Sequence, residues 1–240
     1  MKPRLSSFIC GCLAFLLTNA AKPASADEIK PLSSSALAEA AAAPDVQRAL
    51  QLMHDPKRDA EVVALFMKAA ERGNPVAETY LGYLSYMGHG LPQNDQIAAQ
   101  WYQRAAVQGF LDAELRLGAL YLNGRELLDG RGVDRDYQAA VEWLQHAADQ
   151  GSVTAVSLIG ETYMTQALNG DSAQIGLARE YLRRAAKMHD PWAPSLLCFS
   201  LKYFPEPEQD ASCDPEPLIP EGATNNQGND ILNSDQIPRP

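Results

Sequence analysis

Side chains capable of acid–base or metal chemistry are scattered along the chain. Ser-x-x-Lys and Gly-x-Ser-x-Gly motifs are absent, and no two histidines have the spacing that places metal ligands on one helix face. Asp134 and Asp136 are explained by capping of a helix start. We therefore predict no catalytic residue, no metal site and no cofactor. The histidines stand one per repeat of the pattern described next: His54, His89, His146 and His189.

Alanine pairs recur along the chain at intervals of 36, 42 and 38 residues. Two further columns keep the same intervals, one of large side chains and one of glycines. Agreement of independent columns indicates an internal repeat. The pairs are Ala69-Ala70, Ala105-Ala106, Ala147-Ala148 and Ala185-Ala186, the large residues are Leu65, Trp101, Trp143 and Tyr181, and the glycines are Gly82, Gly118 and Gly160.

Apolar residues within each repeat follow helical spacing, and glycine or proline separates the segments. The segments are short, so their stability must come from stacking on neighbours. A glycine inside a helix costs about 1 kcal/mol, so its recurrence points to close helix packing. We predict an all-α fold, a right-handed α-solenoid of stacked antiparallel helix pairs over 44–204. The expected helices are 44–53, 59–72, 75–87, 95–108, 111–122, 136–150, 152–167, 173–188 and 191–203.

The two ends of the chain differ from the repeats in composition. Residues 1–26 resemble a secretory signal peptide: two basic residues, an apolar run too short to span a bilayer, and Ala24-Ser25-Ala26 as the cleavage site. Residues 27–43 are expected to be a linker, with a helix start possible near Leu37. Residues 205–240 contain 7 of the 16 prolines and eight acids, which predicts a disordered acidic tail.

Removal of 1–26 would leave a net charge of −13, which disfavours nucleic acid and anionic lipid as partners. The predicted location is periplasmic, without membrane insertion after cleavage. In an exported chain, the remaining cysteines Cys198 and Cys213 favour one disulfide. The alternative is a buried thiol at Cys198 and a free one in the tail. Lipid modification at Cys10 or Cys12 is a lesser alternative.

The repeat has a family resemblance. Residues 98–109 read A-x-x-W-Y-x-x-A-A-x-x-G, 113–124 read A-x-x-x-L-G-x-x-Y-x-x-G, and 132–140 read G-V-x-x-D-Y-x-x-A. This pattern resembles the Sel-one-like repeat, a relative of the tetratricopeptide repeat, over about 59–203. It departs in a longer loop, RELLDG, after Gly124, and in Cys198, which stands in the glycine column.

The resemblance implies a scaffold or adaptor that binds another envelope or secreted protein on a concave face. In such superhelices the first helix of each pair lines that face, and alignment on the glycine column assigns seven residues to it. The alternative is that the tyrosines only pack against the next unit. The predicted partner-binding residues are Tyr83, Tyr86, Met87, Asp112, Asn123, Glu161 and Met164.

Two other functions stay open at this point. One is an immunity protein that neutralises a secreted toxin, for which the acidic charge suits a basic target. The other is a β-lactam or cell-wall amide hydrolase, a function given to some relatives of the repeat. No nucleophile supports the hydrolase, and loss of turnover in a Glu161 or Tyr83 variant would be its test.

Overall fold

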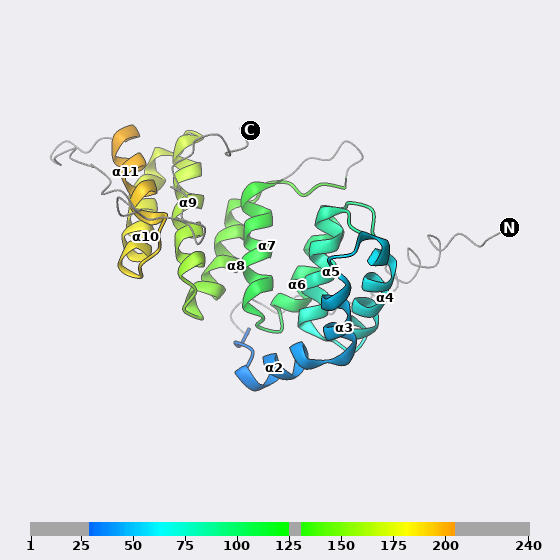
Figure 1. The fold of residues 1–240 in the computed structure, drawn as a ribbon. Coiled ribbons are helices and arrows are strands. Elements are labelled where there is room, and N and C mark those ends of the chain that lie inside the picture. Colours follow the sequence, from blue (N-terminus) through cyan, green and yellow to red (C-terminus); the bar gives the residue numbers. More distant parts are fainter. Residues whose placement is uncertain (1–28, 125–130, 205–240) are drawn as a thin grey trace, which may run out of the picture.

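The computed structural model describes residues 29–124 and 131–204, and within them the chain forms a row of helices (Figure 1). Successive helices pack side by side from α3 onward, which confirms the predicted solenoid of helix pairs. The observed bounds lie within two residues of the predicted ones. They are α2 (Ser34–Ala42), α3 (Pro44–Leu52), α4 (Asp59–Ala70), α5 (Pro75–Met87), α6 (Asp95–Ala106), α7 (Leu111–Asn123), α8 (Tyr137–Asp149), α9 (Val153–Leu168), α10 (Ile175–Lys187) and α11 (Ala193–Tyr203), with short 3-10 turns at Pro56–Arg58 and Ser172–Gln174.

Local signals set these bounds. The side chains of Asn74, Asn94 and Ser152 each accept a hydrogen bond from a backbone N–H in the first turn of the helix that follows. Asp136 does the same for α8, as its position predicted. The glycine stops are also observed, and His189 takes the equivalent left-handed conformation, with φ 64°, after α10.

The core consists of the columns that the repeat defines. Trp101 is fully buried between units, and Trp143 and Tyr181 are partly buried. The alanine pairs are buried or nearly so, so adjacent helix backbones approach closely. One aliphatic column has no exposed surface at all: Leu81, Leu117 and Ile159.

The recurring glycines meet a steric requirement. A Cβ atom on Gly82 would lie 2.5 Å from the Tyr102 ring, and one on Gly118 would lie 2.6 Å from Leu144. On Gly160 it would lie 2.8 Å from Leu182. In each unit the glycine therefore lets a side chain of the second helix pack directly against the backbone of the first helix.

The N-terminal segment corrects one expectation. Residues 27–43 were expected to be a linker, but Ser34–Ala42 form the helix α2. The Ser33 hydroxyl caps it by accepting from Ala36 N, and the Asn74 side chain donates to the Ala40 carbonyl at 2.8 Å. An alanine-rich segment with a serine cap thus becomes helical because it can dock beside α5. Residues 1–28, the inserted loop 125–130 and the tail with Cys213 lie outside the described residues.

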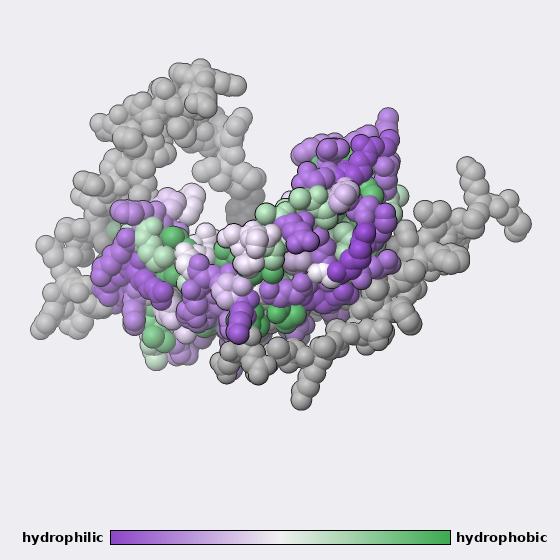
Figure 2. Space-filling model, turned by 90° about the horizontal axis from the view of Figure 1, so that it is seen from below, coloured by the Kyte–Doolittle hydropathy of each residue, from purple (hydrophilic) through white to green (hydrophobic). Residues whose placement is uncertain are grey.

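The view from below shows a surface that is mainly hydrophilic, with smaller separate hydrophobic patches (Figure 2). No helix of the described ranges is both long and apolar enough to cross a membrane.

Candidate protein-binding groove

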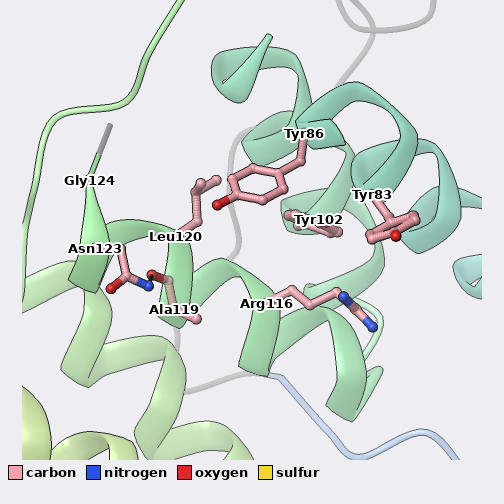
Figure 3. A pocket seen from close by; sticks show the side chains of 8 residues that line it. All are labelled: Tyr83, Tyr86, Tyr102, Arg116, Ala119, Leu120, Asn123 and Gly124. Atoms are coloured by element: carbon pink, nitrogen blue, oxygen red, sulfur yellow. Dashed lines mark hydrogen bonds between the residues drawn. The ribbon is translucent and has the colours of Figure 1, made fainter. Parts of the chain in front are cut away.

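A hollow of about 180 Å³ opens between α5 and α7, with α6 behind it. Figure 3 shows Tyr86 reaching from α5 toward Leu120 of α7, while Arg116 extends from α7 to lie below Tyr83. The lining is mostly aromatic and aliphatic, which suits an apolar group of a partner. Its residues are Tyr83, Tyr86, Tyr102, Arg116, Ala119, Leu120, Asn123 and Gly124.

A second hollow of about 320 Å³ adjoins the first, because Tyr83 and Arg116 line both. It runs from α5 toward the C-terminal end of α3. Its residues are Met53, Thr79, Tyr80, Tyr83, Asp112 and Arg116. We call the two hollows together the tyrosine groove.

Tyr102 reaches the groove from the second helix of its unit. The missing side chain at Gly82 lets the Tyr102 ring pass behind α5. Only 3% of Tyr102 is exposed, and burial raises the pKa of its hydroxyl well above the ordinary range. Tyr102 therefore contributes a neutral ring and hydroxyl to the wall of the groove at any physiological pH.

Arg116 supplies the positive charge of the groove. Its Nε donates to the Asp112 carboxylate at 2.8 Å, and its guanidinium carbon lies 5.8 Å from the centre of the Tyr83 ring. An arginine held in this way keeps its planar guanidinium group beside the Tyr83 ring. Arg116 and Asp112 are each more than 40% exposed in their side chains, so a partner can reach both.

The predicted binding residues divide into two sets. Tyr83, Tyr86, Asp112 and Asn123 come together in the tyrosine groove. Met87, Glu161 and Met164 do not line it. Met87 is 43% exposed at the end of α5.

Glu161 and Met164 lie on α9, farther along the solenoid than the groove. Only 5% of Met164 is exposed, so it is a packing residue. Glu161 is half-buried, and burial raises the pKa of its carboxyl. Glu161 therefore does not join Tyr83, the other residue named for a hydrolase, in the tyrosine groove.

Sequence reasoning missed Tyr102, Arg116 and Tyr80. Arg116 follows Asp112 by four residues, which places both on one helix face. The alignment that assigned Asp112 could therefore also have assigned Arg116. Tyr102 could not be found in this way, because it belongs to a second helix and reaches the wall of the groove only through the close approach at Gly82.

A third hollow, about 640 Å³, follows α8 and α9. Its lining contains two tyrosines, Tyr137 and Tyr163, among mostly polar side chains: Gln138, Glu142, Gln145, His146, Asp149, Gln166 and Gln174, with Val141. Flexible polar side chains of this kind are poor anchors compared with tyrosine and arginine, and this hollow has no arginine in its lining. The described residues contain no group of three or more His, Cys, Asp or Glu that could hold a metal ion.

Fold and groove together define a class: an α-solenoid of helix pairs whose first helices carry a surface groove. The comparisons with known proteins name the repeat. The Sel1 repeat model matches residues 75–110, 111–152 and 159–190. Three segments of the chain therefore match the Sel1 repeat, which confirms the resemblance that the motifs predicted.

One of the similar solved structures supports this fold. A protective antigen of uropathogenic Escherichia coli with an SLR fold is 26% identical, with a TM-score of 0.51, over 72% of this chain and 37% of that one. The chain thus spans little more than a third of that antigen. A Sel1 repeat protein from Oxalobacter formigenes is 24% identical, with a TM-score of 0.48, over 68% of each chain.

An immunity protein from Pseudomonas aeruginosa is 22% identical, with a TM-score of 0.42, over 77% of this chain and 66% of that one. At these values the similarity carries no argument about function. No curated protein sequence matches the chain.

Proposed function

We propose that this protein is a non-catalytic interaction scaffold that binds a segment of a partner protein in the tyrosine groove. Sel1 repeat proteins are generally protein-interaction scaffolds. The observation that carries the proposal is the meeting of Tyr83, Tyr86, Tyr102 and Arg116 in one hollow. Tyrosine and arginine are the residue types that dominate binding energy at protein interfaces.

The groove also indicates the form of the partner. Its two hollows share Tyr83 and Arg116, so they form a track across α3, α5 and α7. A track of this kind accepts an extended segment or a helix edge that places one apolar side chain in the smaller hollow. Asp112 and Arg116 then offer one acceptor and several donors to polar groups beside that anchor.

The location and the partner class extend the proposal. From the signal-like residues 1–26 we infer export to the periplasm, with another envelope protein as the partner. An acidic scaffold favours a partner with a basic surface, whose association slows as salt screens the attraction. Fractionation of cells that express the full chain tests the location, and recovery with cytoplasmic markers would contradict it.

The binding test uses two matched tyrosine substitutions. Partners captured from envelope extract are identified by mass spectrometry, and the affinity of the leading one is then titrated against the wild-type chain, Tyr86→Ala and Tyr137→Ala. Tyr137 lies in the polar hollow of α8, so it controls for loss of any tyrosine. We expect Tyr86→Ala to weaken binding about tenfold or more and Tyr137→Ala to change it little. Equal affinities, or loss only with Tyr137→Ala, would reject the groove.

A further inference from the structure

The polar hollow along α8 and α9 differs in chemistry from the tyrosine groove, and the two share no lining residue among those described. Its volume of about 640 Å³ is that of a cavity for a small molecule or a short chain. On α8 its lining runs from Tyr137 to Asp149, which corresponds to about 18 Å of helix. The polar hollow is therefore longer than a single sugar ring.

Hydrogen bonds within the described chain orient several groups of this lining. The Tyr181 hydroxyl donates to Gln145 Oε1 at 3.1 Å, and Gln145 Nε2 donates to Asp149 Oδ1 at 2.7 Å. At the other end of α8, the Asn169 side chain donates to the Tyr137 hydroxyl at 2.7 Å. One amide, one carboxylate and one phenol are thus held in place along the hollow before any ligand arrives.

The repeat framework does not require these polar side chains. Alignment on the alanine pairs, which are 42 residues apart here, matches Asp149 with Val107 and Gln166 with Gly124 of the preceding unit. Both units form the same kind of helix pair. The polar lining is therefore a property of this unit and not of the repeat.

The donors and acceptors of the lining indicate a class of ligand. Glutamine amides both donate and accept, carboxylates accept, and tyrosine adds a hydroxyl to a flat ring. A sugar presents the complementary groups: hydroxyls that donate and accept, and C–H faces that pack on an aromatic ring. The side chains of Gln138, Glu142 and Gln166 have no hydrogen-bond partner among the described residues, so each can take a sugar hydroxyl.

Charge separates a neutral sugar from other ligands. Lysine and arginine are absent from the described lining, whereas Glu142 and Asp149 make it acidic. An anionic ligand, an acidic sugar included, would be repelled. A basic peptide would use only the acceptors and leave the amide N–H groups without a role. A neutral oligosaccharide pairs with both kinds of group.

We propose that the polar hollow binds a neutral oligosaccharide. The rings of Tyr137 and Tyr163 pack against its C–H faces, and the glutamines and Glu142 bind its hydroxyl groups. Tyr181 supports this arrangement, because its ring lies 5.8 Å from that of Tyr163 between centroids. The sugar is a second ligand of the scaffold, so this site stands or falls independently of the tyrosine groove.

The first experiment titrates the full chain with three neutral tetrasaccharides: cellotetraose, maltotetraose and chitotetraose. We expect at least one of them to bind with a Kd below about 1 mM in isothermal titration calorimetry. Saturation-transfer NMR should then show contact at the C–H protons of that sugar. Failure of all three to bind at millimolar concentration would overturn the proposal.

The second experiment locates the sugar with matched variants. Tyr137→Ala and Gln166→Ala should each weaken binding of the best tetrasaccharide about tenfold, because one removes a stacking ring and the other an amide. Tyr86→Ala, in the tyrosine groove, is the control and should leave the sugar affinity unchanged. Circular dichroism confirms that each variant is folded. Wild-type affinity in both hollow variants, or an equal loss in Tyr86→Ala, would overturn the site.

The third experiment tests the charge of the ligand with tetragalacturonic acid and tetralysine. The double variant Glu142→Gln/Asp149→Asn keeps hydrogen-bonding groups and removes both charges, so neutral sugar binding should stay within about threefold of wild type. Tetragalacturonic acid should not bind the wild-type chain. Tetralysine binding that exceeds every neutral sugar and is lost in the double variant would assign the hollow to a basic segment and overturn the proposal.

Discussion

Two consecutive repeat units bury the same acidic residue and treat it differently. Glu78, 1% exposed, accepts from Arg104 at 2.8 Å and from Gln108 at 2.7 Å, so both of its oxygens are paired. Glu114, fully buried at the equivalent position, accepts from Gln150 at 2.7 Å, and its other oxygen has no hydrogen-bond partner. Burial raises the pKa of each carboxyl to about 7. At Glu78 the charge of Arg104 acts in the opposite direction and lowers the pKa, whereas at Glu114 no cation does so.

The comparison extends along the repeat. In the incomplete unit before Glu78, Asp45 of α3 pairs with Lys68 and Arg72, and the hydrogen bond from Lys68 leads the interactions that lower its pKa despite some burial. In the unit after Glu114, the residue equivalent to Glu78 and Glu114 is Val156. This repeat position thus passes from an ion-paired glutamate to an apolar side chain, and Glu114 is the intermediate case. A solenoid tolerates this because each unit contacts only its neighbours.

The largest expected effect separates the two tryptophans of these units. Trp101→Ala should lower the free energy of unfolding by about 3 to 5 kcal/mol, because the ring is fully buried. Trp143 is partly exposed, so Trp143→Ala should cost clearly less. Urea unfolding followed by circular dichroism measures both. Equal losses would show that the two units pack their aromatic residue alike.

Removal of Arg104 tests the paired glutamate. Arg104→Met should cost about 3 kcal/mol at pH 8, because it leaves a buried carboxylate without its cation. At pH 5.5 the loss should be smaller, since Glu78 can then bind a proton. Arg116→Met is the matched control: its partner Asp112 is exposed, so we expect less than about 1 kcal/mol at either pH. A pH-independent loss would contradict the buried-charge account.

Glu114, which has no cation partner, gives the free energy of unfolding a pH dependence of known sign. The folded-state pKa of Glu114 lies above its ordinary value of 4.5, so the stability that Glu114 contributes is fully present below pH 4.5 and is lost as the pH rises through 7. Glutamine does not ionise, so Glu114→Gln should raise the free energy of unfolding at pH 8 by about 2 kcal/mol and change it little at pH 4.

Glu78→Gln is the control for Glu114→Gln. It should stabilise less or destabilise at pH 8, because Arg104 then loses its counter-charge. Denaturant midpoints across pH 4 to 8 provide the measurement. A Glu114→Gln variant that keeps the wild-type slope would mean that water satisfies the free oxygen.

Much of this architecture was predictable from the sequence. Alanine pairs, glycines and aromatic columns are short-range signals that repeat, so they fix helix bounds and the order of packing. Burial of Glu78 and Glu114 was not predictable, because a glutamate in a helix normally indicates an exposed face. The position of Met164 was misjudged for a related reason. Leu122 and Met164 occupy the same repeat position as Tyr86, yet both are buried. One repeat position therefore lines a groove in one unit and packs inside the solenoid in the next two.

The smallest expected effect tests what the two units have in common. Gly118→Ala should cost about 1 to 2 kcal/mol, because the added methyl group meets Leu144 at 2.6 Å and the Ala140 carbonyl at 3.2 Å. Gly176→Ala is the control. It also lies within a helix, α10, but its Cβ would meet nothing within 4 Å, so it should raise stability by up to about 1 kcal/mol. Opposite signs, read from urea midpoints, separate a steric requirement from helix propensity; two stabilised variants would mean that the units do not need close helix approach.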